Sequence, residues 1–264
     1  MKVGIIGIGN IAAALVEGLS TAPRPEGAGT VTGAGEPELF LSPRNEARST
    51  ALAAQYPRVT RLESNQAVVD RSEIVIISVR PPVAAEVLSA LRFRPDHIVV
   101  SLVALLRYDD LVSLVAPAVD VSRAIPMPAV ARHNCPIALF RPAPAVEQLF
   151  GRVGAPLIVT DEGQLHALWT LTGLITPFYD LLAGLSGWAI AHGVAPLTAN
   201  AYTAHLYQSL AALAQADPAT GFPAFAHHAA TPGGLNEQAG REIRDAGAHR
   251  AWIEAADRLL IRFG

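Results

Sequence analysis

Short apolar runs alternate with helical segments through the first half of the chain, and this alternation restricts the fold more than any other feature. The apolar runs cover residues 2–8, 38–42, 73–79, 97–103 and 119–125. Segments with helical character lie between them, at residues 10–20, 46–55, 83–91 and 107–115. Apolar strands separated by helices are typical of βαβ units, in which helices cover both faces of a parallel sheet. The sequence therefore predicts an α/β fold that begins with a doubly wound parallel sheet of the Rossmann type, with weaker strands at 136–140 and 156–160.

The second half of the chain indicates helices alone. Pro177 predicts a helix break near Thr176, because a proline inside a helix removes a hydrogen bond and clashes with the preceding turn. Pro196 suits the first turn of a helix that runs to about Ala216, and apolar side chains recur along one face from His249 to the C-terminal region. We therefore predict a dinucleotide-binding domain at residues 1–160 and an all-α dimerisation and substrate domain at residues 161–264.

A long uncharged stretch lies within the helical half, with no Asp, Glu, Lys or Arg between residues 181 and 216. A membrane-spanning helix needs about 20 apolar residues, but glycines, Pro196 and polar side chains interrupt this stretch. Helices buried in a subunit interface explain it better than a membrane span. We therefore expect a homodimer, or an assembly of dimers, and no membrane partner.

Composition narrows the classes of partner. Hydrophobic residues make up 51% of the 264 residues and charged residues 16%, which predicts extensive buried surface. The net charge is −3 with no basic block, so we expect no nucleic-acid partner and a small-molecule substrate. A single cysteine and the lack of a secretory signal predict a cytoplasmic location. The Gly/Pro-rich residues 21–37 are expected to form a loop between the first helix and the second strand.

The first apolar run ends in a glycine motif, Gly7-Ile8-Gly9-Asn10-Ile11-Ala12. Gly7 permits a tight turn, Gly9 lets the backbone approach a pyrophosphate, and Ala12 allows close packing of the helix that follows. The first helical N–H groups add donors and a favourable dipole for an anion. An ordinary glycine turn is the alternative, but the strand-then-helix context predicts dinucleotide binding by Gly7, Gly9, Asn10 and Ile11.

The end of the second strand selects between the two nicotinamide cofactors. NAD sites place an acid there for the ribose 2′-OH, whereas a 2′-phosphate needs positive charge. This chain has Ser42, Arg44, Asn45 and Arg48. The two arginines could clamp the phosphate while Ser42 and Asn45 add hydrogen bonds, although both arginines could instead be solvated charges on a surface helix. We predict NADP(H) in preference to NAD(H).

Four motifs occur in an order that resembles the pyrroline-5-carboxylate reductase family. They are the Gly7-x-Gly9-Asn10 start, Ser78-Val79-Arg80-Pro81, Arg123-Ala124-Ile125-Pro126 and Thr231-Pro232-Gly233-Gly234. Members of that family reduce a cyclic imine to proline with NAD(P)H, and their helical second domain interlocks with a partner subunit that completes the active site. The resemblance covers almost the whole chain and implies the same fold, activity and dimer here.

The resemblance also implies roles for individual residues. Val79, Arg80 and Pro81 would lie beside the ribose and nicotinamide of the cofactor. The turn at residues 231–234 would hold the substrate carboxylate through backbone donors, which suits small residues that open a helix; a plain glycine entry to the helix is the alternative. Substrate-binding residues would be Gly233, Gly234, Leu235 and Thr176, and the catalytic residues Thr231 and Asn236.

Three departures from the family fall on the substrate side. Residues 123–129 are one residue shorter than the family motif and lack its asparagine, and residues 172–177 are bulkier than the family's turn. Asn236 stands where the family has the threonine that hydrogen-bonds the imine, and an amide can donate but cannot lose a proton.

No other side chains form a compelling catalytic or metal set. The histidines at 192, 205, 227 and 228 are expected to be packed or surface residues. His227 and His228 point to different sides of a helix, so no metal site is predicted. Asp180, after Pro177, could pair with a cationic iminium, and Cys135 is expected to be a buried small hydrophobe. The sequence predicts an NAD(P)H-dependent reductase of a cyclic imine, with pyrroline-5-carboxylate as the default substrate. A reductase of another imine or a carbonyl, and a non-catalytic NADP-binding regulatory protein, remain alternatives.

Overall fold

The computed structural model describes residues 1–23 and 36–264, and most of the predicted loop at 21–37 lies outside the described residues. The chain forms two compact units, residues 1–169 with Phe263 and residues 170–262 with Gly264. The boundary predicted near residue 160 falls just in front of helix α7 (Glu162–Thr172). In the structure most of α7 belongs to the first unit, because Leu165 is buried there and Leu168 and Trp169 pack beside it.

The first unit contains one sheet of eight strands in the order β3-β2-β1-β4-β5-β6-β7-β8. The strands are β1 (Lys2–Ile6), β2 (Glu38–Leu41), β3 (Val59–Arg61), β4 (Ile74–Ile77), β5 (Ile98–Ser101), β6 (Asp120–Ile125), β7 (Pro136–Phe140) and β8 (Ala155–Val159). The helices are α1 (Asn10–Thr21), α2 (Glu46–Gln55), α3 (Asn65–Arg71), α4 (Pro81–Ser89), α5 (Tyr108–Val115), the 3-10 helix η1 (Pro128–Arg132) and α6 (Pro144–Gly151).

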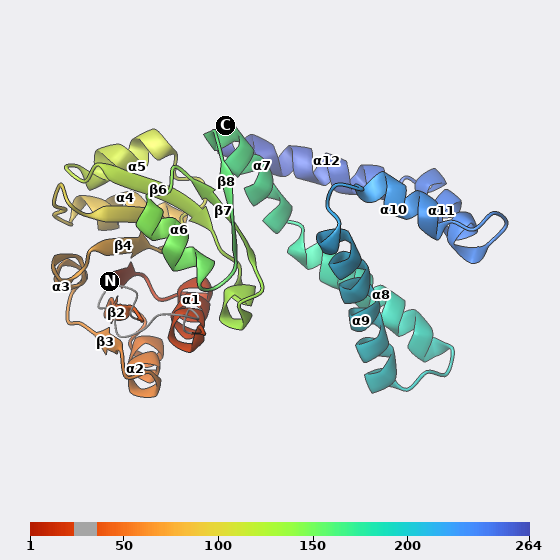
Figure 1. Ribbon diagram of the computed structural model, residues 1–264, viewed down its shortest axis with the longest axis horizontal. Helices are drawn as coiled ribbons and strands as arrows, with labels where there is room; N and C mark the ends of the chain where they lie inside the picture. Colours follow the sequence, from red (N-terminus) through yellow and green to blue (C-terminus); the bar gives the residue numbers. More distant parts are fainter. Residues whose placement is uncertain (24–35) are drawn as a thin grey trace. The chain divides into compact units, whose positions relative to one another are not determined.

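Helices cover both faces of this sheet (Figure 1). On one face Leu15 of α1, Leu52 of α2 and Phe150 of α6 share a core with the strands. On the other face Val68 of α3, Leu88 of α4 and Leu111 of α5 do the same. The central strand β4 is buried on both sides, as its unbroken run of four β-branched residues requires. The doubly wound Rossmann-type sheet predicted from the sequence is confirmed.

The direction of the last two strands differs from the all-parallel prediction. Strand β7 pairs antiparallel with β6, and β8 runs parallel to β7. The connection at residues 126–135 contains only the short helix η1. Parallel neighbours need a crossover of about a dozen residues or more, usually with an α-helix. The chain therefore turns back after β6.

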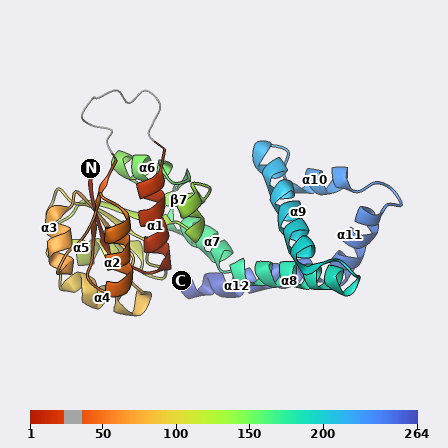
Figure 2. The same cartoon turned by 90° about the horizontal axis from the view of Figure 1, so that it is seen from below.

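The second unit consists of helices, as predicted. They are α8 (Ile175–Ala191), α9 (Pro196–Ala216), α10 (Phe222–Ala229), α11 (Leu235–Asp245), α12 (Ala248–Leu260) and the 3-10 helix η2 (Ile261–Phe263), whose last residue belongs to the first unit. Helices α8 and α9 contact each other and cross steeply in the view of Figure 2, with the rings of Phe178 and Tyr207 6.4 Å apart in an edge-on contact.

The helix break lies in front of the predicted position. Helix α7 ends at Thr172 and α8 begins at Ile175, so the break predicted near Thr176 falls at Gly173 and Leu174. Pro177 lies in the first turn of α8, where its missing N–H is no loss and the carbonyl four residues back is outside the helix. The two helices together are the one stretch among the described residues, Glu162–Ala191, that is long and apolar enough to cross a membrane, which is weak evidence by itself.

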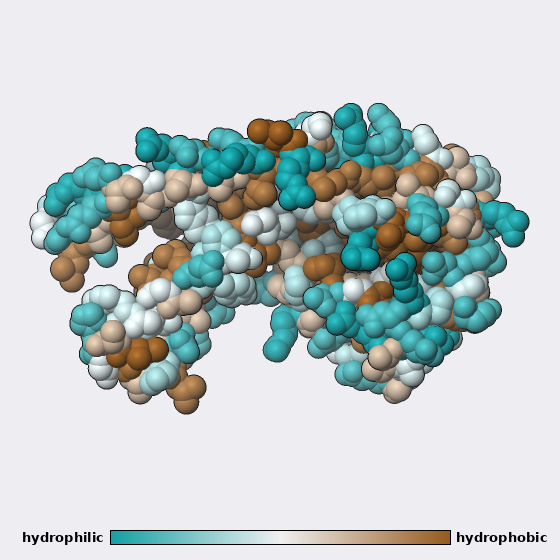
Figure 3. Space-filling model, turned by 180° about the vertical axis from the view of Figure 1, so that it is seen from behind, coloured by the Kyte–Doolittle hydropathy of each residue, from teal (hydrophilic) through white to brown (hydrophobic). Residues whose placement is uncertain are grey.

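The second unit leaves most of its apolar side chains exposed. Within residues 170–262, all of them described, the buried side chains are Thr170, Ser186, Ala199 and Thr203. Apolar patches are visible on the surface in Figure 3. On α9, the exposed side chains of Tyr202, Leu206, Leu210 and Leu213 recur three to four residues apart, which places them on one face.

Candidate functional site

The glycine motif forms a tight turn between β1 and α1. Gly7 has φ +93°, and a Cβ there would lie 2.8 Å from both the Ser78 carbonyl oxygen and the Val79 Cγ1 atom. Its N–H donates to Oγ of Ser42 at 2.9 Å. No side chain can replace Gly7 without moving the end of β4, so the turn requires glycine in this position.

Gly9 differs from Gly7, because open space surrounds it. A Cβ at Gly9 would meet no atom within 4 Å, yet Gly9 is the N-cap of α1. No acidic side chain lies in the first turn of α1 to neutralise the helix dipole. The first turn of α1 therefore presents its N-terminal N–H groups and the positive end of its dipole beside open space at Gly9, an arrangement that favours an anion.

The topology places this turn where α/β proteins bind nucleotides. Strand β1 lies between β2 and β4, so the strand order reverses there. Ligands bind outside the carboxyl ends of strands at such a switch point. The glycine turn, the end of β2 and the end of β4 all lie at this edge.

Side chains after β2 tie the start of α2 to the glycine turn. Asn45 has φ 64° and donates from Nδ2 to the Ile8 carbonyl at 2.9 Å. Arg48 donates from Nη1 to Oδ1 of Asn10 at 2.9 Å. The structure thus brings together five of the predicted cofactor residues, namely Gly7, Asn10, Ser42, Asn45 and Arg48.

These contacts change the roles expected of the residues that were predicted to bind the 2′-phosphate. Ser42 is wholly buried and its hydroxyl accepts from Gly7, so it shapes the turn rather than presenting a free group to a phosphate. Arg44 has an exposed side chain at the same edge, and Arg48 is half-buried. Glu46, the first residue of α2, pairs with Arg61 at 3.3 Å. Arg44 is therefore exposed to solvent at this edge, whereas Arg48 is held by Asn10.

The remaining predicted cofactor residues follow β4. Val79 is half-buried, Arg80 is exposed and is the N-cap of α4, and Pro81 is the first residue of that helix. Ile11, in the first turn of α1, is half-buried.

The predicted substrate loop is an exposed turn that opens α11. Gly233 has φ +72°, and its N–H donates to Oε2 of Glu237 at 2.7 Å. The Gly234 N–H donates to the Thr231 carbonyl at 2.8 Å, closing the turn. The N–H groups of Gly233 and Gly234, in the turn whose backbone donors were predicted to hold a substrate carboxylate, are therefore both engaged within the chain.

The other predicted substrate-side residues are exposed. Asn236 donates from Nδ2 to the Ala229 carbonyl at 3.0 Å, which ties the start of α11 to the end of α10. Thr231 and Leu235 lie on the surface of the turn, and Thr176 lies in the first turn of α8. Asp180 and the histidines at 192, 205, 227 and 228 are also exposed.

A buried charged cluster in the first unit was not predicted. Arg123, in the middle of β6, is wholly buried, and its Nη1 atom donates to Oε1 of Glu162 and, at 2.9 Å, to Nε2 of His166. The guanidinium lies 4.9 Å from the centre of the Trp169 ring, and the rings of His166 and Phe263 stack at 4.8 Å. A lone arginine within the apolar run VDVSRAI was the available signal, because a buried charge needs a partner.

Burial sets the protonation states in this cluster. Burial lowers the pKa of the Arg123 guanidinium, and the nearby Glu162 carboxylate opposes that change. Burial, followed by the positive charge of Arg123, lowers the pKa of His166. His166 is therefore held neutral and accepts the hydrogen bond from Arg123.

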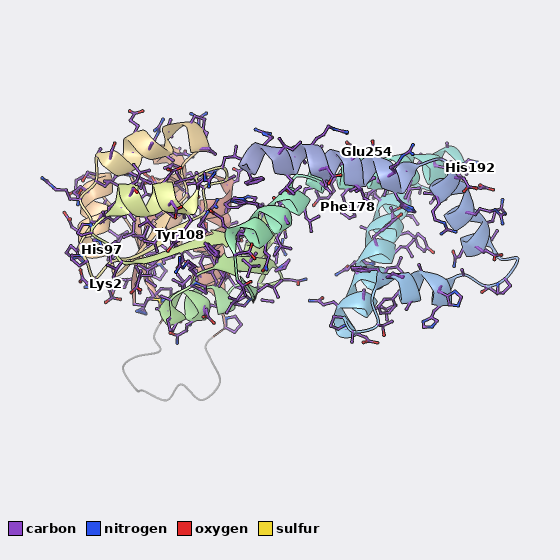
Figure 4. All side chains as sticks on the ribbon, turned by 90° about the horizontal axis from the view of Figure 1, so that it is seen from above. Lys2, His97, Tyr108, Phe178, His192 and Glu254 are labelled. Carbon is purple, nitrogen blue, oxygen red and sulfur yellow. The ribbon has the colours of Figure 1, made fainter. Side chains whose placement is uncertain are left out.

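Glu162 also caps a helix. Its Oε1 atom accepts the Tyr108 N–H at 2.7 Å, and Tyr108 is the first residue of α5. The carboxylate therefore satisfies one of the free donors of that helix as well as the buried guanidinium. Figure 4 labels Tyr108 within the first unit.

Two sequence predictions remain, the apolar role of Cys135 and the lack of a metal site. Cys135 is buried, and burial raises the pKa of its thiol, so the predicted role as a small apolar residue is confirmed. Among residues 1–23 and 36–264, no group of three or more His, Cys, Asp or Glu side chains is arranged to hold a metal ion.

The fold and the glycine turn define a Rossmann-type domain followed by a helical unit. Residues 2–105 match the family described as NADP oxidoreductase coenzyme F420-dependent. No curated protein matches the sequence.

Solved structures share the fold over the whole chain. The 1-pyrroline-5-carboxylate reductase of Streptococcus pyogenes is 20% identical, has a TM-score of 0.83, and the alignment covers 100% of this chain and 98% of that one. The NADP-bound pyrroline carboxylate reductase of Plasmodium falciparum is 13% identical, with a TM-score of 0.81 and coverages of 100% and 97%. An imine reductase of Aspergillus terreus bound to dibenz[c,e]azepine is 18% identical, with a TM-score of 0.53 and coverages of 83% and 76%. The chain therefore has the pyrroline-5-carboxylate reductase fold, as the sequence motifs implied.

Proposed function

We propose that this protein is an NADPH-dependent reductase of a cyclic C=N bond, with pyrroline-5-carboxylate as the reference substrate. The open glycine turn at the start of α1 carries the proposal, because it is built to accept a pyrophosphate at the switch point of the sheet. The full-length likeness to pyrroline-5-carboxylate reductases supports the reaction class.

The chain offers groups for each part of the cofactor. Gly9 and the N-terminal turn of α1 would hold the pyrophosphate, Arg44 and Arg48 the 2′-phosphate, and Val79 with Arg80 would lie beside the nicotinamide ribose. When bound, the reduced nicotinamide supplies a hydride. The protein's task is to hold an electrophilic carbon about 3 to 3.5 Å from the donor and to exclude water.

The reaction needs no strong acid from the protein. A cyclic imine takes its proton from solvent, and the hydride then adds to the carbon of the iminium to give the neutral amine. Thr231 and Asn236 are proposed to orient the substrate on the second unit, with Gly233, Gly234, Leu235 and Thr176 lining its site. Thr231, Asn236, Leu235 and Thr176 have exposed side chains, which leaves them accessible to a small molecule.

Steady-state NADPH oxidation with a panel of cyclic imines and carbonyl compounds tests the proposal. We expect turnover with one or more imines and none with the carbonyl compounds. Turnover of carbonyl compounds alone would show that the protein is a carbonyl reductase instead. Tight NADPH binding without turnover on the whole panel would instead support a regulatory NADP-binding protein.

We further propose that the functional form is a homodimer, located in the cytoplasm, that completes its active site across the interface. The exposed apolar face of α9 supports the dimer, because a second copy can cover side chains that this chain leaves in water. Leu210→Glu should convert the dimer to a monomer in light-scattering measurements. Gln208→Glu, which adds the same charge at a neighbouring position of α9, is the control and should remain dimeric.

A further inference from the structure

The loop that opens α11 already contains a carboxylate of its own. Oε2 of Glu237 accepts the N–H of Gly233 at 2.7 Å. The next donor, the Gly234 N–H, is used by the Thr231 carbonyl at 2.8 Å. A substrate carboxylate can reach the Gly233 donor only if it displaces Glu237, and it must then remain close to that charge.

Helix capping explains part of this arrangement. Glu237 is the third residue of α11, where an acid favours the helix dipole and commonly reaches back to the N-cap N–H. Here the N-cap is Gly234, but Glu237 passes it and binds the preceding residue, Gly233, whose φ of +72° turns its N–H toward the helix. The carboxylate therefore occupies the turn itself, and no atom lies within 4 Å of a Cβ placed at Gly233.

We propose that Glu237 sets the substrate class of the reductase by selecting cyclic imines that lack a carboxylate, bound as iminium cations. The proposal rests on the imine reductase function proposed above. A second carboxylate beside Glu237 would meet like-charge repulsion and would cost a charge-assisted hydrogen bond. A protonated iminium carries the opposite charge and is attracted. The stoichiometry is unchanged, because the proton is already on nitrogen and the hydride adds to carbon.

A matched pair of substrates tests this role. Pyrroline-5-carboxylate and 1-pyrroline differ only by the carboxylate, so the ratio of their kcat/KM values isolates its effect. We expect the wild type to favour 1-pyrroline about tenfold, the size of effect expected from losing one charge-assisted hydrogen bond. Glu237→Gln, which keeps an acceptor for Gly233 but removes the charge, and Glu237→Ala, which also frees the donor, should shift the ratio progressively toward pyrroline-5-carboxylate.

Glu242→Gln is the matched control. Glu242 lies on the same helix and accepts from Nε2 of Gln238 at 2.9 Å, away from the turn. The control removes the same charge from α11 and should leave the substrate ratio unchanged. If it shifts the ratio as far as Glu237→Gln does, the effect is one of overall charge and the proposal fails.

A binding measurement separates this proposal from the reductase assignment. L-proline and pyrrolidine are the corresponding products, and their stabilisation of the NADP-loaded protein can be followed by thermal unfolding. We expect pyrrolidine to stabilise the wild type and L-proline to stabilise only the Glu237 variants. If both imines turn over but pyrroline-5-carboxylate is preferred and no Glu237 variant changes the ratio, Glu237 is a helix cap alone. If neither imine turns over, the proposed reductase function is wrong. Equal stabilisation by L-proline and pyrrolidine in the wild type and the Glu237 variants would show, independently of turnover, that Glu237 does not select the substrate.

Discussion

Removing the Glu162 carboxylate should destabilise the first unit strongly. Glu162 is the anionic partner of the wholly buried Arg123 and also accepts the first N–H of α5. Glu162→Ala would leave a guanidinium in the protein interior without its counter-ion. Breaking a buried pair in this way costs about 3–5 kcal/mol, a large part of the 5–15 kcal/mol by which proteins are stable.

The expected loss is large enough to measure by two independent methods. For a protein of this size each kcal/mol lowers the Tm by about 2–4 °C, so the Tm of Glu162→Ala should fall by about 10 °C. Urea unfolding should give a lower midpoint with little change of slope. Glu162→Gln, which keeps an acceptor oxygen but removes the charge, should fall between Glu162→Ala and the wild type.

An exposed ion pair provides the control. Glu46 pairs with Arg61 at 3.3 Å, but its side chain is 78% exposed, so Glu46→Ala should cost less than about 1 kcal/mol. A Glu162→Ala loss as small as that of Glu46→Ala would refute the reasoning, because it would mean that water reaches the guanidinium. Arg123→Met should cost less than Glu162→Ala, since it removes the buried charge instead of leaving it unpaired.

Three further predictions concern the cofactor and pH. Arg44→Ala should weaken NADPH binding about tenfold and leave NADH binding nearly unchanged in fluorescence titrations, since a lost phosphate contact costs about one charge-assisted hydrogen bond; equal losses would remove the clamp. Gly9→Val should abolish NADPH binding while the Tm stays within about 2 °C of the wild type, because the new side chain meets no protein atom within 4 Å; retained binding would place the pyrophosphate elsewhere. Burial lowers the pKa of both His97 and His166, so the unfolded chain binds more protons than the folded one below about pH 6.5. Stability should therefore decrease as the pH falls from about 7.5 to 5.5, and His166→Gln should reduce that decrease in urea unfolding; an unchanged pH slope would show that folding does not shift the pKa of His166.

The sequence predicts the sheet well where side-chain burial alone decides the structure. Apolar runs of four or more residues become strands, because a strand buried on both faces must be apolar throughout. The short strand β3 has one buried side chain in three residues, Val59, and leaves no such signal. The antiparallel direction of β7 could not be predicted from its apolar run either. Strand direction depends on the length of the connection at 126–135 and not on the strand itself.

The candidate site also has features that the sequence predicts and contacts that only the fold reveals. Gly7 could be recognised because its backbone conformation and its close neighbours demand glycine, and Gly9 because of its spacing in the motif, since open space surrounds it. The contacts of Ser42 with Gly7 and of Arg123 with Glu162 join residues 35 and 39 positions apart. Such pairings follow from the tertiary fold, so the sequence showed the residues without their partners.

The cofactor side and the substrate side of the protein are therefore determined by different kinds of constraint. A pyrophosphate needs backbone donors and a turn without side chains, which few sequences satisfy, and this chain keeps that turn intact. A substrate is selected by a few exposed side chains on a turn that many sequences can form. Glu237 is compatible with the conformation of the turn, because its carboxylate accepts the Gly233 N–H. The same carboxylate places a negative charge where the backbone N–H groups alone would favour an anion. Likeness of fold therefore supports the proposed cofactor site more directly than it supports any one substrate, and Glu237 is the residue at which we propose that the substrate class is set.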